Sequence, residues 1–378
     1  MTTTSSYAPT INDQLVTFHS SYEKEPIYGC NNKRAFYLKE PLKIYVPKSR
    51  QLKTKTKTKT KTKIKTKIKT SKTKQTKKNN CVIYSDPAAK QILLHNLAAN
   101  KRINVNQIIP PKQSLGNCWM NTWFVSFFIS DKGRKFFHFF RQLMIEGKLA
   151  TGSTIEPKSL RDAFALLNYA IESAIMGTPA AYEIDTNGVI KGIYKSLSSV
   201  SYHSSYISKL DEGGNPIRYY YAIIDYLNGL SKTNTYDIQV ISLFIMKNGE
   251  WKDRIQQEML KHKQPPHVIV IEIPDEESKH ITDRPLEIDM GNNIKYKLDS
   301  CIVRDVRSQL HFCALITCEG KEMGYDGMSF GRFKPVQWKT KYLNSPKTWS
   351  FKGSTDDNEK IMLWSFRHGY QMLLYYRV

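Results

Sequence analysis

The stretch GNCWMN, residues 116–121, places a cysteine at the head of a long run of aromatic and aliphatic residues. Met120, Trp123, Phe124 and Phe127 recur behind it at helical spacing, so the run predicts a helix that begins at Cys118. The positive end of a helix favours a thiolate over a thiol, and the thiolate is the nucleophilic form. Cys118 is therefore a candidate nucleophile, and the alternative is a small buried residue that begins a helix.

Further helical and strand patterns follow along the chain. Helices are expected over 133–144, over a segment that Ser159 caps and that carries apolar residues to Ile171, and over 219–230. Beyond about residue 236 the pattern changes to short β-branched or aromatic runs at 238–246, 267–273, 296–303, 310–318 and 371–378. This order predicts an α+β protein, helical over about 105–235 and a largely antiparallel sheet over 236–378.

A cysteine nucleophile needs a base, and the base needs a group that orients it. His311 lies on a predicted strand, and Asp326 follows it 15 residues later across a glycine-containing turn. Two adjacent antiparallel strands would place this imidazole and carboxylate side by side. Gln113, five residues before Cys118, is expected to stabilise an oxyanion together with the backbone N–H of Cys118. The alternative for His311 is a buried histidine with a structural role.

A zinc site is the competing interpretation of His311, Cys313 and Cys318. Residues 311 and 313 share one face of a strand, but 318 has the opposite parity to 313 and no fourth ligand is evident. The sequence therefore predicts neither a metal nor another cofactor.

The net charge of +23 is unevenly distributed over the 378 residues. Residues 53–78 carry 13 lysines and no acidic residue, mostly alternating with threonine. We expect 51–80 to be a disordered low-complexity tract, because it has little to bury and much to repel. It either binds nucleic acid or an acidic surface or has no ligand. Residues 1–50 form an N-terminal extension, and the folded domain is expected over 81–378.

The six cysteines include no CxxC pair and no evenly spaced framework, which indicates a reducing, intracellular compartment, either cytoplasm or nucleus. The N-terminus lacks the pattern of a signal peptide, and no apolar run is long enough for a transmembrane helix. The Lys-, Asn- and Ile-rich usage is typical of an AT-rich genome, such as that of a parasite or a large DNA virus. A viral chain would be found in the host cell or the virion.

Several of these segments together resemble the ubiquitin-specific protease family of papain-like cysteine peptidases. LGNCWMNT (115–122) resembles the family's cysteine box, and PPHVIVIEI (265–273) stands where a family strand is expected. The histidine box is matched in order by KYKLDSCIV (295–303), LHFCAL (310–315) and GKEMGYDG (320–327), and the final strand by GYQMLLYYR (369–377). The resemblance covers about residues 105–378.

The resemblance implies a helical thumb followed by a β-sheet palm, and cleavage of peptide or isopeptide bonds after the terminal glycine of ubiquitin or a ubiquitin-like protein. It places the family's nucleophile on Cys118, its histidine on His311 and its first acid on Asp326. No cofactor is implied.

The chain departs from the family pattern at five places. Asn117 stands where the family has threonine, Leu310 replaces a glycine, Gly327 replaces a second acid, and the zinc-bearing fingers are absent. Gln113 stands where the family has asparagine, and a glutamine there is also a feature of papain and calpains. Two alternatives follow: a ubiquitin-binding or assembly module with an impaired site, and a papain- or calpain-like protease that processes a different protein.

Overall fold

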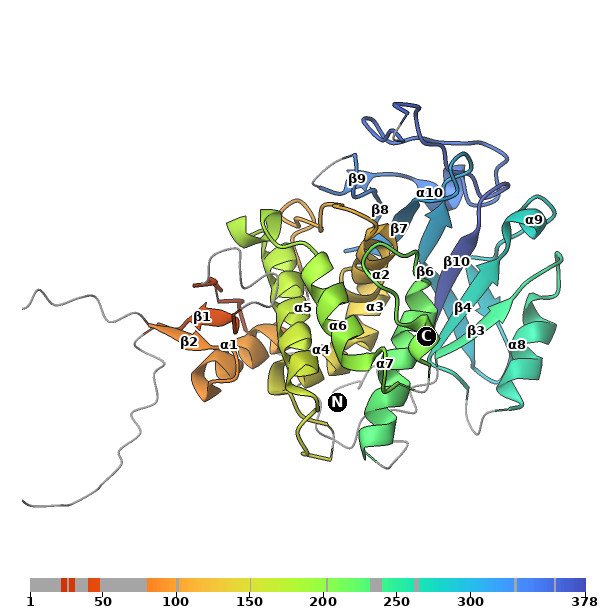
Figure 1. Ribbon diagram of the computed structural model, residues 1–378. Helices are drawn as coiled ribbons and strands as arrows, with labels where there is room; N and C mark the ends of the chain where they lie inside the picture. Colours follow the sequence, from red (N-terminus) through yellow and green to blue (C-terminus); the bar gives the residue numbers. More distant parts are fainter. Residues whose placement is uncertain are drawn as a thin grey trace, which may run out of the picture.

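The computed structural model describes most of the chain beyond residue 79 and three short stretches before it. The described residues are 22–25, 27–30, 40–47, 80–99, 102–149, 151–201, 203–231, 240–261, 265–329, 332–356 and 358–378. Together they form an α+β protein, in which the helices before residue 232 lie on one face of a central sheet and helices of the second half pack on the other (Figure 1).

The central sheet has eight strands in the order β3-β4-β10-β6-β7-β8-β9, and β5 pairs with β6 outside this path. Only β3 and β4 run parallel to each other, and the other pairs are antiparallel. All five predicted strand runs contain a strand. The strands are β3 (Val240–Phe244), β4 (Val268–Ile273), β5 (Glu287–Asp289), β6 (Lys295–Arg304), β7 (Phe312–Cys318), β8 (Lys321–Tyr325), β9 (Lys334–Pro335) and β10 (Gln371–Arg377).

The helices gather mainly in the first half of the chain, as predicted. They are α1 (Pro87–Ala98), α2 (Cys118–Phe128), α3 (Asp131–Phe136), α4 (His138–Glu146), α5 (Lys158–Met176), α6 (Asn187–Leu197), α7 (Pro216–Ser231), α8 (Trp251–Met259), α9 (Asp275–Ser278) and α10 (Trp338–Lys341), with short 3-10 turns at Pro179–Tyr182 and Ser204–Tyr206.

Two details of the helix prediction are wrong. The single helix expected over 133–144 is divided between α3 and α4, and the chain leaves the helical conformation at Phe137. Ser159 does not cap α5, because the helix begins one residue earlier behind Pro157. The Ser159 hydroxyl instead lies 2.7 Å from the hydroxyl of Ser196 on α6. That contact links two packed helices.

Each face of the sheet contributes to a different hydrophobic core. In β10, Met372, Leu374 and Tyr376 pack with the helices of the first half, whereas Leu373 and Tyr375 face the opposite side. On that opposite side they meet α8, α10 and the segment 343–366. The two-residue alternation of a strand therefore places apolar side chains on both faces of β10.

Helix α2 lies inside the molecule and carries Cys118 at its first position. All eleven of its residues are buried, and the polar Asn121, Thr122 and Ser126 are among them. It packs against β7 and β6 on one side and α7 on another. The N-terminus of α2 is thereby held near the first residues of β7.

The strands β7 and β8 form the predicted hairpin. Cys318 pairs with Lys321 beside the turn, and Ala314 pairs with Tyr325 toward the open end. Gly320 in the turn has φ +72°, a conformation that glycine adopts without a steric cost. His311 precedes the first strand and Asp326 follows the second, so both lie at the open end.

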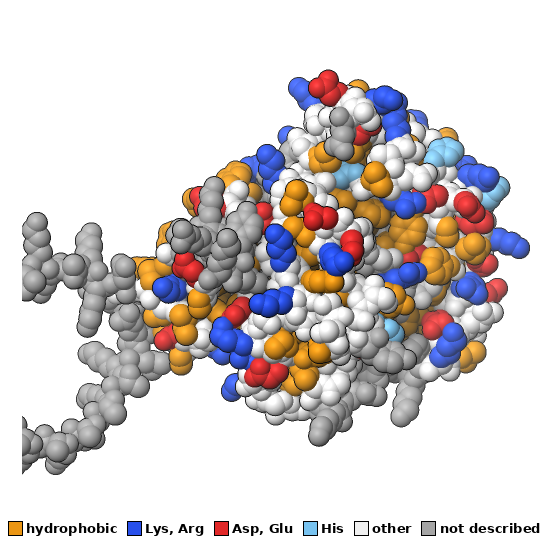
Figure 2. All heavy atoms as spheres, viewed as in Figure 1, with side chains coloured by type: hydrophobic (Ala, Val, Ile, Leu, Met, Phe, Trp, Pro, Cys, Tyr) orange, Lys and Arg blue, Asp and Glu red, His pale blue; other side chains and the backbone are white. Residues whose placement is uncertain are grey.

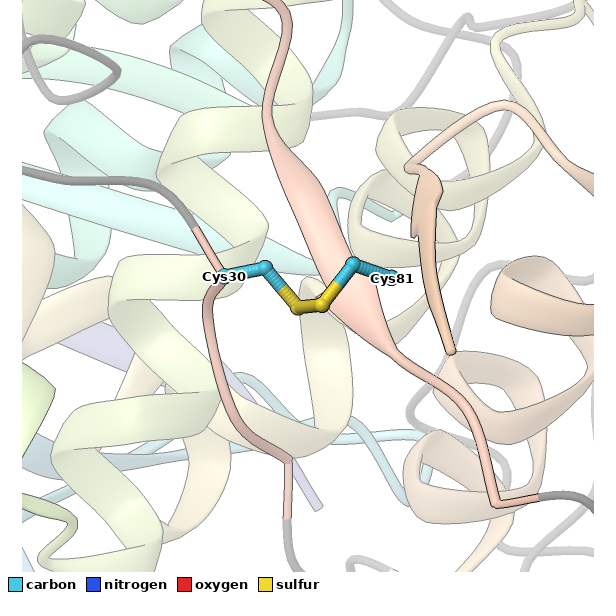
Figure 3. The surroundings of a disulfide bond; sticks show 2 residues. All are labelled: Cys30 and Cys81. Atoms are coloured by element: carbon cyan, nitrogen blue, oxygen red, sulfur yellow. A yellow bond between two sulfur atoms is a disulfide. The ribbon is translucent and has the colours of Figure 1, made fainter. Parts of the chain in front are cut away.

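The described parts of the first 50 residues pack onto the helical half. Strand β1 (Lys43–Tyr45) pairs with β2 (Cys81–Ile83), and Ile27, Ile44 and Val46 lie in the helical core. A disulfide joins Cys30 to Cys81 beside this small sheet (Figure 3). The cysteine spacing gave no sign of this pair.

The N-terminal segment also carries a buried ion cluster. Lys24 Nζ lies 2.5 Å from Glu172 Oε1, and Arg141 Nη2 lies 2.6 Å from Glu172 Oε2. The Glu172 side chain has no exposed surface and that of Arg141 has 1%. Burial opposes ionisation of Glu172, but the two cations override it and lower its pKa. Residue 24 is thus bound to α5 directly and to Arg141 on α4 through their shared partner Glu172.

The Lys/Thr-rich segment predicted to be disordered lies outside the described residues, apart from Asn80. On the face of the folded body shown in Figure 2, lysine and arginine side chains are interspersed with aspartate and glutamate. No helix in the part of the chain that the structure describes is both long enough and apolar enough to cross a membrane.

Candidate active site

Cys118 lies at the junction of the two halves. It is the first residue of α2, and 7% of its surface is exposed. Its Sγ lies 3.7 Å from the carbonyl oxygen of Leu310, which is the residue before His311. The predicted nucleophile and the predicted base are therefore brought together from positions far apart in the sequence.

A buried polar network holds the loop that precedes Cys118. Asn117 is fully buried, and its Oδ1 accepts hydrogen bonds from the backbone N–H of Ser114 (3.1 Å) and from Asn121 Nδ2 (3.3 Å). Its Nδ2 donates to Thr186 Oγ1 at 3.1 Å, and that hydroxyl donates to Asn121 Oδ1 at 2.6 Å. Asn117 is thus the residue through which the loop is joined to the start of α6.

Asn187 holds the same loop from a second side. Its Nδ2 donates to the backbone oxygen of Ser114 at 3.1 Å and to the Ser114 hydroxyl at 2.8 Å. Neither Thr186 nor Asn187 was singled out from the sequence, because a lone threonine or asparagine gives no signal of a partner some 70 residues away. The only local sign is that both residue types are common where helices begin.

His311 and Asp326 form a buried pair. Their side chains are 3% and 0% exposed, and His311 Nε2 lies 2.6 Å from Asp326 Oδ1. Burial on its own lowers the pKa of His311, but the Asp326 hydrogen bond and the adjacent Cys118 override it and raise the pKa to about 9. The hairpin thus places these two side chains as the sequence predicted.

The remaining atoms of the pair define their orientation. His311 Nδ1 is buried and has no hydrogen-bond partner among the described residues. Asp326 Oδ1 also accepts the backbone N–H of Met328 at 3.0 Å. Burial opposes ionisation of Asp326, but the hydrogen bond and charge of His311 keep its pKa lowered. Nδ1 is therefore the ring nitrogen left for a reacting partner, while Nε2 is held by the carboxylate.

Gln113 lies between the cysteine loop and the aspartate loop. Its backbone N–H donates to the carbonyl of Gly327 at 2.9 Å, and its side-chain Nε2 lies 3.4 Å from the carbonyl of Leu115. A Cβ atom on residue 327 would come within 3.1 Å of the Gln113 backbone nitrogen and Cβ. This close approach gives a physical reason for glycine at 327, where the resembled family has an acid.

Two apolar side chains on the loops beside the site point into solvent. Leu310 is 81% exposed and Leu115 is 63% exposed. Leu115 also has φ +60°, which is uncommon for a residue with a side chain. Leu310 belongs to the loop of the histidine and Leu115 to the loop of the cysteine.

The alternative zinc set finds no support among the described residues. No group of three or more His, Cys, Asp and Glu side chains there is arranged to hold a metal ion. Cys318 Sγ instead lies 3.7 Å from the carbonyl of Ile129, and burial raises the pKa of the Cys313 thiol well above its usual value.

The raised pKa of His311 predicts a pH dependence of stability. A pKa of about 9 in the folded state, against about 6.5 in the unfolded chain, gives a stabilisation of about 3 kcal/mol that is present below pH 6.5 and lost between pH 6.5 and 9. We expect the free energy of unfolding to fall over this interval more in the wild type than in His311→Gln. Urea unfolding at pH 6 and pH 9 measures both. Equal falls in the two proteins would contradict the raised pKa of His311. Burial lowers the pKa of Lys24 to about 8, but Lys24 is present in both proteins and its contribution cancels in the comparison.

The chain has only distant similarity to known proteins. No family model and no curated protein matches the chain. Among solved structures, a chain of the "SAGA Ubp8/Sgf11/Sus1/Sgf73 DUB module bound to ubiquitin aldehyde" aligns with a TM-score of 0.42 and 10% identity over 74% of this chain and 71% of that chain. A chain of the same module without the aldehyde gives 0.42 and 11% over 74% and 69%, and a chain of the yeast SAGA DUB module gives 0.32 and 11% over 74% and 70%. These similarities are too low to assign a family or a function.

Proposed function

We propose that the protein is a cysteine peptidase that cleaves after the C-terminal glycine of ubiquitin or a ubiquitin-like protein. The observation that carries the proposal is the His311–Asp326 pair at 2.6 Å, fully buried and placed against a cysteine at the start of a helix. A base, an orienting carboxylate and a thiol in this order are the groups that thiol catalysis requires.

The proposed reaction proceeds through a thioester. The Cys118 thiolate attacks the carbonyl carbon of the terminal glycine, and a C–S bond forms. His311 takes up the thiol proton at Nδ1 and passes it to the leaving amine as the C–N bond breaks. Water then hydrolyses the thioester with His311 as base. Asp326 holds Nε2 throughout, so that the ring keeps one orientation.

Gln113 is proposed as the oxyanion donor, together with the backbone N–H of Cys118. Its Nε2 is near the Leu115 carbonyl at a long 3.4 Å, so a stronger acceptor in the transition state would attract it. The substrate class rests on the resemblance of the cysteine and histidine boxes. The same resemblance supports a papain-like arrangement in which the helical half is the thumb and the sheet half the palm.

Reaction with a ubiquitin derivative that bears a C-terminal electrophile tests the proposal. We expect one covalent adduct of the full-length protein, detected by intact mass, at Cys118, and none with Cys118→Ala. Cys313→Ala is the matched control, because Cys313 is a completely buried thiol in the same structure. It should leave adduct formation unchanged. An adduct that persists in Cys118→Ala would contradict the assignment of the nucleophile.

A ubiquitin-binding module with an impaired site is the second candidate. One observation favours it: the Cys118 thiol is hydrogen-bonded to the Leu310 carbonyl, and His311 Nδ1 has no partner among the described residues. This candidate predicts that the wild type and Cys118→Ala bind monoubiquitin equally well and that neither forms an adduct. A papain- or calpain-like protease acting on another protein would instead show a reactive Cys118 and no binding to monoubiquitin.

A further inference from the structure

The connection between β6 and β7 is wrapped around a buried carboxylate that no sequence motif indicated. Asp305 has no exposed surface, and its side chain accepts hydrogen bonds from five consecutive backbone N–H groups. They are those of Arg307 (3.1 Å), Ser308 (2.6 Å) and Gln309 (3.3 Å) on Oδ2, and those of Leu310 (3.1 Å) and His311 (3.0 Å) on Oδ1.

The loop is closed at its base as well as at its centre. The backbone N–H of Asp305 donates to the carbonyl of His311 at 2.9 Å, directly after the last strand pair of Arg304 and Phe312. Gln309 has φ +57°, a left-handed conformation that costs a non-glycine residue about 1 kcal/mol or more. The five N–H bonds to Asp305, together with the Ser308 hydroxyl, which donates to the same carboxylate, stabilise the chain in this shape.

The last peptide of this loop connects Asp305 to the site. Asp305 Oδ1 accepts both N–H groups of Leu310 and His311. The carbonyl oxygen of Leu310, within the same peptide unit as the His311 N–H, lies against the Cys118 thiol. Asp305 Oδ1 therefore fixes the peptide between Leu310 and His311. This peptide leads into the residue that carries the imidazole, and its carbonyl oxygen contacts the Cys118 thiol.

We propose that Asp305 is a positioning residue for the Cys118–His311 pair. The inference rests on the proposed function, and it goes beyond it because Asp305 touches neither the substrate nor a reacting atom. A carboxylate has two acceptor oxygens, and here three N–H groups share Oδ2 and two share Oδ1. Asparagine has one acceptor oxygen, and its NH₂ group would meet N–H groups with no acceptor between them. An isosteric change is therefore expected to loosen the loop.

Alkylation of Cys118 by iodoacetamide between pH 5 and pH 9.5 tests the proposal without ubiquitin. An ordinary thiol reacts slowly at pH 6, because its thiolate forms only near about pH 8.5, whereas a thiol paired with an imidazolium remains reactive. We expect wild-type Cys118 to react at pH 6 nearly as fast as at pH 8. In Asp305→Asn the rate at pH 6 should fall about 10- to 100-fold and approach the wild-type rate at pH 9.5.

The experiment contains its own controls. Peptide-level mass spectrometry also follows Cys301, Cys313 and Cys318, which have no exposed surface and are alkylated only if the protein unfolds. Asp289→Asn is the matched substitution, because Asp289 is an exposed aspartate that accepts the N–H of Gly291 in a turn far from Cys118 in the sequence. Its profile should equal that of the wild type.

The outcomes separate the inference from the proposed function. Alkylation of the three buried thiols in Asp305→Asn would mean that this variant unfolds. Asp305→Glu is then the test variant, because glutamate keeps the negative charge but moves the carboxylate by one methylene group. It should lower the rate at pH 6 about 10-fold with those thiols silent. A wild-type pH profile in a folded Asp305 variant would overturn the positioning role alone. A wild type that is unreactive at pH 6 would overturn the Cys118–His311 pair and this inference with it. Failure of the ubiquitin electrophile with an otherwise reactive Cys118 would overturn only the ubiquitin substrate, and the Asp305 result would still stand.

Discussion

If the proposed function holds, replacing Asp326 by asparagine is expected to reduce hydrolysis of a ubiquitin C-terminal fluorogenic substrate about 10⁴-fold, as the same change does in the serine-protease triad. The carboxylate accepts a hydrogen bond from His311 Nε2, whereas an amide NH₂ group at that place favours the tautomer that carries its proton on Nδ1. Nδ1–H is unable to take up the thiol proton. The loss should therefore appear in kcat, measured between pH 5 and pH 10.

The same substitution should lower the pKa of His311. Burial already opposes the imidazolium, and the Asp326 hydrogen bond is the largest of the effects that raise the pKa to about 9. An NMR titration of the ring protons reports this change independently of activity. Asp289→Asn, which removes an exposed carboxylate, is the control and should alter neither quantity. Full activity in Asp326→Asn would show that another group orients His311.

Replacing Glu172 by alanine is expected to lower the free energy of unfolding by about 3–5 kcal/mol. The substitution leaves Arg141 and Lys24 buried without their shared counter-ion, and an uncompensated buried charge is more costly than a lost hydrogen bond. Urea unfolding at neutral pH measures the change. Because the N-terminal segment is bound through Lys24, we also expect proteolysis near residue 24 to become faster.

A matched surface variant and a compensated variant test this explanation. Glu212→Gln removes one partner of the exposed pair with Lys209 and should have no measurable effect. Replacing Glu172, Arg141 and Lys24 together by apolar residues should recover much of the loss, because no charge is then left buried. A fall of less than about 1 kcal/mol for Glu172→Ala would mean that water reaches the two cations.

The sequence predicted the placement of His311 beside Asp326, because local patterns were sufficient there. The hairpin that brings His311 beside Asp326 could be predicted, because two short strand-like runs flank a glycine-containing turn. Antiparallel pairing of these runs places residues at their outer ends next to each other. The helix after Cys118 followed from apolar residues that recur at helical spacing, although its complete burial was not predicted. Both features depend on residues close together in the chain.

The supports of the site depend on contacts between distant residues and were missed. Asn117 meets Thr186 on α6, and that helix was itself not predicted. Lys24 meets Glu172 across 148 residues, and Cys30 meets Cys81 across 51. Such pairs carry no periodic signal, because each residue type is common and the fold alone brings the partners together. Asp305 is close in sequence to the residues that it binds, but an aspartate in a turn usually accepts one or two N–H groups. The sequence of this loop does not indicate that five would converge on it.

The small sheet of β1 and β2 has a consequence for how the chain tolerates change in length. The N–H of Val46 donates to the carbonyl of Asn80, so two described residues on either side of the Lys/Thr-rich segment lie next to each other. The entropic cost of closing a flexible connection grows only with the logarithm of its length, about 0.6 kcal/mol for each doubling. The folded domain is therefore expected to tolerate changes in the number of Lys-Thr units with little change in its free energy of unfolding.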